Sequence, residues 1–556
     1  MSHVTINLYP DSIGNSLSDA LRFLQQSGLK GLFDGCYLMP TLFNTDLDGG
    51  FSVITYDLNR CLATQADMDA LHAAGIRVQT DLILNHLSVL SPQFQDLLRH
   101  GEHSAYRDFF IDWNRFFAGS GCMGDDGIVH PAPGDFLGMN LRKKGYPVLK
   151  VRFPDGRDIP FWNTFYQKIL YPRPDAISLM DCTGGQYASA QRLEKRIRDA
   201  LDAGKTPEEI DFSGFEDAKE TVTERLLSQR RYLGQMDVNI QSAKVWEWYG
   251  VVMDQLRAYH VCRLRLDAFT RLHKAWRRAN FLNEPETWNI LERVRGMAEE
   301  RGMEALPEMH ATYASGAWRK ISDAGCVTYD YFLPGLILDA LITGDGQYLA
   351  AWAQAQEKAG ARVVNMLGCH DGIPIRDLRG LLPEVRMQGL VEVLEARGLR
   401  RKMIHGANAE VYQMDGTYLT ALGGDVRKMA LARAIQCFMP GEMQVWYLDL
   451  LCGTNDEERL QKEPGLDNRE LNRTRLDCQH ARAMLMTEGA QRQVAILQMR
   501  RSHPAFSQEA KVQVECGEKQ LRIRRTGAGE TLLLEAELSD GSYRILGEEG
   551  TVWLHG

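Results

Sequence analysis

The first hundred residues alternate short apolar runs with helical patterns, and this alternation limits the fold more than any other feature of the sequence. Strands are predicted for VTINLYP, GLFDGCYLMP and IRVQTDLILNH, which are apolar runs bounded by turn residues. Between them, SLSDALRFLQQS and TQADMDALHAAG carry apolar residues at helical spacing, and the second pattern ends at a glycine. Strands joined through helices pair in parallel, so the pattern predicts an α/β chain with a parallel sheet.

The rhythm of strands and helices continues to about residue 500. A closed (β/α)8 barrel, the TIM barrel, accommodates this many units in roughly 250 residues or more. A doubly wound sheet is less favoured, because no glycine-rich dinucleotide-binding fingerprint follows the first strand. We therefore expect an α/β fold built on a (β/α)8 TIM barrel.

Two regions interrupt the rhythm. Residues 101–240 contain stretches rich in aromatic residues, glycine and proline, followed by a charged helical pattern, SAQRLEKRIRDALDAGKTPEEI. We expect an inserted domain there, because a long insertion after a barrel strand commonly builds one wall of the active site. A second irregular region, residues 372–425, is expected to supply active-site loops.

The chain changes character from about residue 505, where apolar and polar residues alternate between turn signals. This pattern predicts a small antiparallel β domain. The expected division is therefore barrel for residues 1–100 and 241–504, inserted domain for 101–240, and C-terminal β domain for 505–556.

Composition excludes several classes of protein. The chain has 556 residues, with 64 basic against 73 acidic side chains, and lacks the basic surplus of a general nucleic-acid-binding protein. No run of about 18 apolar residues occurs and the start carries no basic-then-apolar segment, so we expect neither a membrane span nor a signal peptide. The 11 cysteines include no CxxC pair, which argues against zinc ribbons and favours reduced thiols in the cytoplasm.

Four polar clusters stand where predicted strands end. They are Asn85 with His86, Arg265 with Asp267, Glu308 with His310, and His370 with Asp371. A single carboxylate after a strand is usually a helix cap or a surface charge. Strand carboxyl ends converge on one face of a barrel, however, so four clusters in chain order predict one shared pocket.

The sequence around these clusters resembles glycoside hydrolase family 13, the α-amylase superfamily, and within it the sucrose phosphorylase-like subfamily. The matching stretches are YPDSIG, DGGFSVITY, NHLSVLSPQFQDLL, CHDGIPIRDLRGLL, YQMDGTYLTALG, ARAIQCFMPGEMQVWYLDLLCGTND and NRELNR. The resemblance covers most of residues 3–505 and fails across roughly 166–234, which marks an extra segment in the insertion. It implies a (β/α)8 barrel with an inserted domain B and retaining transfer of one glucosyl group.

The resemblance implies a role for each residue at the centre of the expected pocket. Asp267 would attack the anomeric carbon as nucleophile, Glu308 would act as acid/base, and Asp371 would stabilise the cationic transition state. These residue types suit the chemistry, because a retaining glycosidase uses two carboxyls about 5–5.5 Å apart. Arg265, two residues before Asp267 on the same strand face, would keep it ionised. Glu308 must be protonated for the first step, so partial burial should raise its pKa.

The same resemblance implies a closed subsite for the transferred glucose. His86 and His370 would hydrogen-bond the sugar, and Phe51 would pack beside it. Asp48 and Arg473 would close the subsite with a salt bridge, although an ordinary surface ion pair is an alternative interpretation of these two residues. A closed subsite favours transfer of one glucose over digestion of a chain.

The acceptor side departs from the family's pattern. Where the subfamily carries a phosphate-binding arginine in a loop resembling RPRPGLP, this chain has HPAPGDF and places Ala132 at that position. His130 and Arg173, the latter inside the extra segment, are candidate replacements. Tyr412 and Gln413 match the loop that meets fructosyl and phosphate groups in turn.

Three further residues are candidate acceptor or phosphate ligands. Arg271 stands where the family's pattern has tyrosine, and its guanidinium could bind phosphate or an anionic acceptor, or merely cover the insertion. Lys274 lies where the family often carries lysine or histidine near the acceptor, and a solvated helix lysine is an equal alternative. His310 likewise has a functional interpretation, as an acceptor ligand, and a purely structural one.

These observations predict a phosphorylase that converts sucrose and phosphate to α-D-glucose 1-phosphate and fructose through a β-glucosyl-aspartate. Sucrose 6-phosphate, glucosylglycerate and glucosylglycerol are alternative donors, and a sucrose hydrolase or transglucosidase is an alternative enzyme. An inactive carbohydrate-binding relative is disfavoured, because all three carboxylates are present. The expected partners are a small glucoside and inorganic phosphate, with no cofactor, no metal, no nucleic acid and no membrane.

Overall fold

The computed structural model of the chain describes residues 3–26, 28–136, 139, 145–404, 410–463, 465–507 and 509–556. Parts of the predicted insertion and of the 372–425 region lie outside the described residues, namely 137, 138, 140–144 and 405–409. Within the described ranges, no helix has the length and apolar character that crossing a membrane requires.

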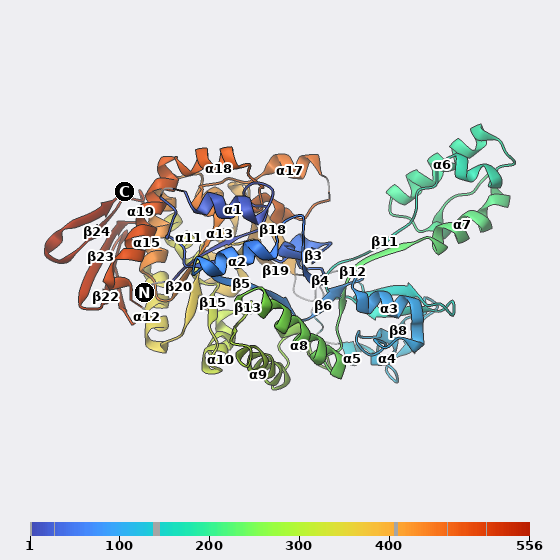
Figure 1. Cartoon of the computed structure of the whole chain (residues 1–556), viewed down its shortest axis with the longest axis horizontal. Helices are drawn as coiled ribbons and strands as arrows, with labels where there is room; N and C mark the ends of the chain where they lie inside the picture. The colour runs from blue at the N-terminus through green and yellow to red at the C-terminus, as the bar shows by residue number, and fades with distance from the viewer. Residues whose placement is uncertain are drawn as a thin grey trace.

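Eight parallel strands form the central sheet (Figure 1). In chain order they are β1 (Val4–Leu8), β2 (Gly35–Leu38), β5 (Arg77–Ile83), β13 (Val261–Asp267), β14 (Glu304–Pro307), β15 (Thr328–Asp330), β16 (Val363–Asn365) and β20 (Glu442–Trp446). β1 lies between β2 and β20; the sheet continues through β5 and β13 to β14 on one side, and through β16 to β15 on the other. The sheet is therefore nearly closed into a barrel, which confirms the predicted (β/α)8 TIM barrel.

Helices surround the barrel and alternate with its strands in sequence. The main ones are α1 (Leu17–Leu24), α2 (Gln65–Ala73), α8 (Ala243–Ala258), α9 (Glu286–Glu299), α10 (Ala317–Asp323), α11 (Leu333–Thr343), α12 (Gln347–Ala359), α15 (Val426–Phe438), α18 (Cys478–Leu485) and α19 (Glu488–Ser502). Their apolar faces belong to the core: α1, for example, buries Leu17, Ala20 and Phe23. α2 begins with a capping box between Thr64 and Asp67, which satisfies backbone donors that the start of a helix leaves unpaired.

After β5 the chain builds an inserted unit around an aromatic core. Its elements are β6 (His86–Ser88), α3 (Pro92–His100), α4 (Trp113–Phe116), β7 (Cys122–Met123), β8 (Val129–His130), α5 (Pro133–Phe136), β9 (Val148–Arg152) and β10 (Asp158–Trp162). The ring of Trp113 packs on Phe117 at 4.6 Å and on Trp162 at 4.9 Å between centroids. The aromatic-rich stretches of the sequence thus form a core of their own, since large rings bury much apolar area per residue.

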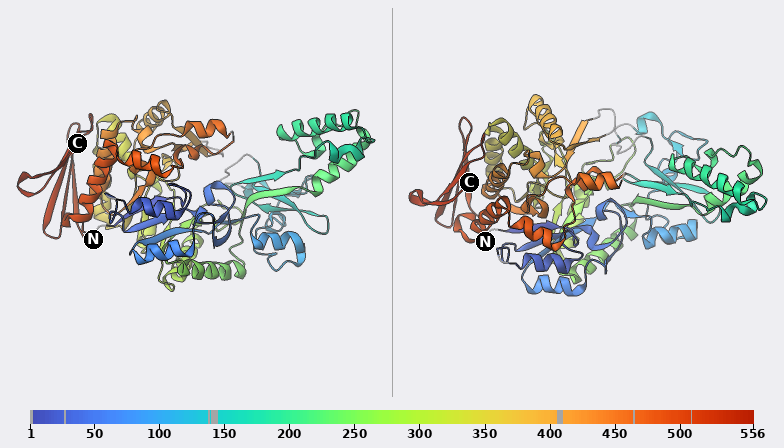
Figure 2. Two further views of the ribbon diagram at one scale, coloured as in Figure 1. Left: turned by 45° about the horizontal axis from the view of Figure 1, so that its top comes forward. Right: turned by 90° about the horizontal axis from the view of Figure 1, so that it is seen from above.

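A helical lobe extends from this unit and has a separate apolar core. The chain leaves through β11 (Gln167–Leu170), forms α6 (Tyr187–Asp202) and α7 (Lys219–Ser228), and returns through β12 (Arg231–Asp237), which pairs antiparallel with β11. Figures 1 and 2 show α6 and α7 well away from the barrel. The lobe falls within the extra segment predicted at 166–234, and α6 contains part of its charged helical pattern.

Residues 372–425 are more regular than the sequence pattern predicted. They contain β17 (Ile373–Pro374), α13 (Glu384–Ala396), β18 (Arg400–Ile404), β19 (Glu410–Asp415) and α14 (Tyr418–Ala421). β19 lies between β17 and β18 in a small antiparallel sheet. These strands are short and mostly polar, which hides them from a search for hydrophobic periodicity.

The tail forms a five-stranded antiparallel sheet, in agreement with the predicted C-terminal β domain. Its strands, neighbours in chain order, are β21 (Lys511–Cys516), β22 (Gln520–Gly527), β23 (Glu530–Glu537), β24 (Tyr543–Leu546) and β25 (Val552–His555). Exposed and buried residues alternate strictly along β22, and the sheet packs against α12 and α15. The division of the chain at residues 100, 240 and 504 stays a prediction.

Two buried arginines fasten this sheet to the barrel. Arg525 on β22 donates to the carbonyl oxygens of Phe438 at 3.1 Å, Met439 at 2.9 Å and Ala505 at 3.3 Å. Arg500 on α19 donates to two further carbonyl oxygens near the same helix end. The last carbonyls of α15 have no partner within the helix and carry partial negative charge. A guanidinium therefore both donates hydrogen bonds to them and offsets their charge.

Replacing Arg525 with methionine should destabilise the fold, because three backbone carbonyls would lose their donor in a buried place. We expect the free energy of unfolding, measured by chemical denaturation, to fall by about 3 kcal/mol. Arg524→Met is the matched control, since Arg524 is exposed on the same strand and should change stability by less than about 0.5 kcal/mol. Equal stability of the two variants would refute the fastening role of Arg525.

Candidate active site

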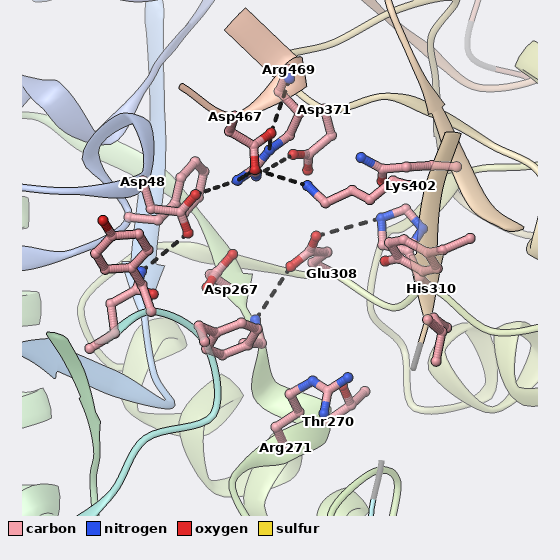
Figure 3. Close-up of a pocket in the computed structure, with 18 of the residues that line it drawn as sticks. Asp48, Asp267, Thr270, Arg271, Glu308, His310, Asp371, Lys402, Asp467 and Arg469 are labelled. Carbon is pink, nitrogen blue, oxygen red and sulfur yellow. Dashed lines mark hydrogen bonds and ion pairs between the residues drawn. The ribbon is translucent and has the colours of Figure 1, made fainter. Parts of the chain in front are cut away.

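The carboxyl ends of β5, β13, β14 and β16 meet around one cavity, where the four polar clusters were predicted to converge (Figure 3). The cavity has a volume of about 310 Å³, which suits a small molecule. The predicted site residues that line it are Asp48, Phe51, His86, Asp267, Arg271, Glu308, His310, His370, Asp371, Tyr412 and Gln413.

Arg265 contacts both predicted catalytic carboxyls from its buried place next to the cavity. Its guanidinium lies 3.3 Å from Asp267 Oδ1 and 2.7 Å from Glu308 Oε1. Asp81 anchors the same guanidinium at 2.5 Å, because β5 and β13 pair with Arg265 opposite Asp81. Arg265 and Asp267 share one face of their strand, and Glu308 follows the neighbouring strand. The two carboxyls are therefore adjacent, an arrangement suited to a double displacement.

The two carboxyls titrate as a pair. Burial, and then the neighbouring Glu308, raise the pKa of Asp267 well above its usual value. Burial also opposes ionisation of Glu308, but Arg265 and His310 outweigh it and hold the pKa of Glu308 below its usual value. The predicted rise in the pKa of Glu308 is therefore wrong for this arrangement, because the cations beside it exceed the effect of burial. Two like charges this close do not form readily together, so the pair shares one proton.

Asp371 is held in its ionised form by its neighbours. His370 Nε2 lies 3.3 Å from Oδ2 of Asp371, and Arg469 Nη1 and Arg473 Nη2 lie 3.0 Å and 3.8 Å from Oδ1. Burial would raise the pKa of Asp371, but His370 and the two arginines hold it well below its usual value. A lasting negative charge at this position can stabilise a cationic sugar.

The predicted ion pair between Asp48 and Arg473 is wrong, because Asp48 pairs with Arg469 instead. Arg469 belongs to the 3₁₀ helix η10 (Asn468–Asn472) and Arg473 is the residue that ends it; both contact Asp371, but their other partners differ. Arg473 donates through Nε to the carbonyl oxygen of His370 at 2.8 Å. Its Nη1 pairs with Glu470 at 3.1 Å.

Arg469 is the residue of this group that sequence reasoning missed. Besides Asp48, it contacts Asp371 at 3.0 Å and Asp467 at 2.8 Å, so it connects three carboxylates. The motif NRELNR contains both arginines. Spacing along the chain could not tell which of the two reaches Asp48, since that depends on how η10 is turned.

Phe51, His86 and His370 form one wall of the cavity. The ring of Phe51 stacks on His370 with centroids 5.0 Å apart, and His86 Nε2 lies 3.0 Å from the carbonyl oxygen of Phe51. Burial lowers the pKa of both histidines, which favours their neutral forms. The Nδ1 atom of each is buried with no hydrogen-bond partner among the described residues, and a sugar hydroxyl could satisfy it.

Arg271 lies on another side of the cavity with its guanidinium near two aromatic rings. It is 5.7 Å from the centroid of Phe165 and 5.4 Å from that of Phe281. Arg271 ends the 3₁₀ helix η7 (Phe269–Arg271), which follows β13 directly, and it lines the cavity as well as packing against the insertion. Aromatic faces attract a guanidinium and help to hold it in place.

Sequence reasoning also missed two further cations that line the cavity. Arg376 begins the 3₁₀ helix η9 (Arg376–Leu378) and pairs with Glu410 at 2.5 Å, whereas Lys402 on β18 lies 3.5 Å from Asp467. Burial, and then the neighbouring Arg469, lower the pKa of Lys402. Arg376 belongs to the matching stretch CHDGIPIRDLRGLL and so had a signal, but Lys402 had none because its strand was not predicted.

Lys274 takes neither of the roles predicted for it. Its ammonium lies 2.8 Å from Asp237 Oδ2 and 3.0 Å from Asn85 Oδ1, and its side chain is 1% exposed. Asp237 reaches this place because β12 and β6 pair with Asp237 opposite His86. The lysine therefore holds the insertion against the barrel. It contacts neither solvent nor the cavity in which an acceptor substrate would bind.

His130 and Arg173 are not among the described residues that line the cavity, and neither is Ala132, so a part for either residue in phosphate binding stays a prediction. His130 is half exposed and pairs with Asp126 at 3.1 Å. Arg173 pairs with Asp202 in the helical lobe, which extends away from the barrel (Figure 1). In the part of the chain that the structure describes, no three His, Cys, Asp or Glu side chains gather as metal ligands do.

Comparison with known proteins gives the family. No family model matches the chain. It is 38% identical to the sucrose 6(F)-phosphate phosphorylase of Ilumatobacter coccineus, over 98% of this chain and 96% of that protein. It is 28% identical to the glucosylglycerol phosphorylase of Marinobacter adhaerens, over 90% of this chain and 88% of that protein.

Comparison of the fold with solved structures leads to the same kind of enzyme. The crystal structure of sucrose 6F-phosphate phosphorylase from Thermoanaerobacter thermosaccharolyticum superimposes with a TM-score of 0.79 at 25% identity, over 100% of this chain and 97% of that one. Similarity of this extent accounts for the barrel and the C-terminal sheet together. The chain is an enzyme of glycoside hydrolase family 13 and belongs to its sucrose phosphorylase-like subfamily.

Proposed function

We propose that this enzyme is a retaining phosphorylase that transfers one α-glucosyl group from a sucrose-type donor to inorganic phosphate. The observation that carries the proposal is the adjacent pair of Asp267 and Glu308 on the guanidinium of Arg265, in a cavity that Asp371 also lines. Similarity to curated phosphorylases over nearly the whole chain supports phosphate as the acceptor.

In the first step, Asp267 attacks the anomeric carbon while the bond to the acceptor oxygen breaks. Glu308 gives its proton to that oxygen, so the acceptor half leaves as an alcohol and a β-glucosyl-aspartate remains. The shared proton of the pair must therefore be on Glu308 when this bond breaks. Arg265 stabilises whichever carboxyl is ionised, because it contacts both.

The glucosyl end of the cavity favours the charge that develops in this step. Asp371, held ionised by its neighbours, stabilises the positive charge on the sugar ring. His86 and His370 offer their buried Nδ1 atoms to sugar hydroxyls, and Phe51 covers one face of the sugar.

In the second step, phosphate attacks the same carbon from the side that the acceptor left. The bond from that carbon to Asp267 breaks, its electron pair returns to the carboxylate, and α-D-glucose 1-phosphate forms. Phosphate carries a proton both as the monoanion and as the dianion. Glu308, left as a carboxylate by the first step, takes a proton from the attacking phosphate, so the pair regains its shared proton for the next turnover. Two inversions retain the configuration of the sugar.

The donor in this proposal carries a phosphoryl group on its acceptor half, as sucrose 6-phosphate does. Arg271, placed near Phe165 and Phe281 at the cavity wall, offers the planar donor fork that suits a phosphoryl group. A relative at 38% identity and a solved structure, both named for that donor, support this choice.

Sucrose itself is the second candidate donor. Tyr412 and Gln413 favour it, because they line the cavity and match the loop that meets a fructosyl group in the family. Glucosylglycerol and glucosylglycerate are further alternatives. Water or a second sugar as acceptor would make the enzyme a hydrolase or a transglucosidase.

The setting of the enzyme is part of the same proposal. Its partners would be small molecules, a glucoside and inorganic phosphate. All 11 cysteines are free, which supports a reducing compartment, and we propose the cytoplasm.

Asp267→Asn should abolish the first step, because an amide cannot form the glucosyl ester. We expect release of glucose 1-phosphate to fall by at least about 10⁴-fold, and the glucosyl adduct seen by mass spectrometry of the wild type to be missing. Asp323→Asn, a change in the last turn of α10 away from the cavity, is the control for the preparation. Substantial turnover by the Asp267 variant would remove it from the nucleophile's role.

Arg469→Gln should narrow the pH range of activity at its acid end. Arg469 lowers the pKa of Asp371, so its loss raises that pKa, and the needed carboxylate is protonated at a higher pH as the solution is acidified. We expect the acid limb of the kcat/KM profile to move toward higher pH. Arg475→Gln, an exposed arginine paired with Asp11 at 3.0 Å, should leave the limb in place. An unmoved limb in both variants would contradict the assignment.

Arg271→Gln should reduce selectivity for a phosphorylated donor. We expect the ratio of kcat/KM for sucrose 6-phosphate to that for sucrose to fall by about 10- to 100-fold, as loss of a hydrogen bond between charged groups predicts. Arg277→Gln removes an arginine whose side chain is 77% exposed and should keep the ratio. An unchanged ratio in the Arg271 variant, or a wild type that prefers sucrose, would favour the second candidate donor.

A further inference from the structure

His310 lines the cavity beside Glu308 and pairs with Asp377, which is buried and does not itself line the cavity. His310 Nδ1 lies 2.8 Å from Asp377 Oδ2, and its Nε2 lies 3.6 Å from Glu308 Oε1. The imidazole packs on the ring of Tyr331 with centroids 3.9 Å apart, which fixes its orientation. Asp377 therefore pairs with one ring nitrogen of His310. The other ring nitrogen is directed at Glu308, where the glycosidic bond would break.

The surroundings of His310 favour its cationic form. The titratable groups that face it are Asp377 on η9, Glu308 after β14, Tyr331 after β15, Asp371 after β16 and Tyr412 on β19. Burial opposes the charge, but Asp377, Glu308 and Asp371 outweigh it and raise the pKa of His310 above its usual value. Arg376, next to Asp377 in the chain, is turned toward Glu410 at 2.5 Å.

We propose that His310, with Asp377 as its charge partner, binds the attacking phosphate, and that Arg271 serves a separate anion position for a phosphoryl group on the acceptor. The inference rests on the proposed phosphorolysis and adds to it the residues that hold phosphate.

The position of His310 meets the main demand on a phosphate ligand. Glu308 protonates the leaving oxygen, so that oxygen lies beside Glu308. The attacking oxygen of phosphate must occupy the same place. His310 Nε2, at 3.6 Å from that carboxyl, can donate to an oxygen there. An imidazolium and a phosphate form a charge-assisted hydrogen bond, which the uncharged Ala132 cannot supply.

Arg271 is placed for a different anion. In Figure 3, His310 and Arg271 lie on different sides of Glu308, and they come from different strand ends. A phosphoryl group on a far carbon of the acceptor cannot also take the place of the glycosidic oxygen. One cation beside Glu308 and another on a separate wall answer these two needs.

The pair makes phosphate binding depend on pH in a definite direction. The imidazolium predominates below the raised pKa of His310 and is lost as the pH rises through it. Asp377→Asn removes the charge that raises this pKa, so affinity for phosphate should be lost at a lower pH than in the wild type. His310→Gln keeps a hydrogen-bond donor but cannot titrate, so it should remove this dependence.

Steady-state kinetics at saturating donor would measure the KM for inorganic phosphate between pH 5.5 and 8.5, with glucose 1-phosphate as the product detected. At pH 7 we expect His310→Gln and Asp377→Asn to raise this KM by about tenfold or more. His100→Gln is the matched control, because His100 also pairs with an aspartate, Asp96 at 2.9 Å, but lies outside the cavity; its KM should equal the wild-type value.

A second measurement separates phosphate binding from glucosyl transfer and folding. α-D-Glucosyl fluoride needs no acid to release its leaving group, so its hydrolysis without phosphate reports formation and breakdown of the glucosyl enzyme. The ratio of phosphorolysis to this hydrolysis should fall in both variants. Equal losses in the two reactions, or an unchanged KM for phosphate, would overturn the assignment of His310. A wild type that releases no glucose 1-phosphate from any donor would refute the proposed function instead.

Discussion

The proposed catalytic arrangement depends on the buried guanidinium of Arg265. It contacts Asp81, Asp267 and Glu308 at once, and so brings together the ends of three neighbouring strands. Carboxylates this close would repel one another in a buried place without a cation between them. The parallel register of β5 and β13 sets Arg265 opposite Asp81, which means that the barrel itself aims the guanidinium.

The remaining charges of the cavity are divided between its two ends. Arg469 connects Asp48 and Asp371 at the end assigned to the glucosyl group, and keeps the needed carboxylate ionised. His310 and Arg271 stand at the end assigned to acceptors, where anions arrive and leave. In the proposed mechanism, such a division lets one small cavity stabilise a cationic sugar and bind an anionic nucleophile in succession.

The residues on strand ends could be predicted from the sequence, whereas many of their partners could not. Asp267, Glu308 and Asp371 each follow an apolar run, and the topology of a barrel is enough to bring such positions to one face. Lys274 stands beyond the end of β13 and was named only through the family resemblance; it is buried against Asp237 because β12 returns from the helical lobe to pair with β6. His130 and Arg173 lie on segments whose direction the local sequence does not specify.

The sequence alone establishes the barrel, the C-terminal sheet and the carboxylates at the strand ends, because strand periodicity and position along a strand are local properties. Tertiary structure decides which arginine reaches Asp48, that burial is outweighed at Glu308, and that His310 is paired with Asp377. Each of these depends on the distance and burial of groups far apart in the chain. Electrostatic energies change steeply with both, so the pattern of residues along the sequence does not contain them.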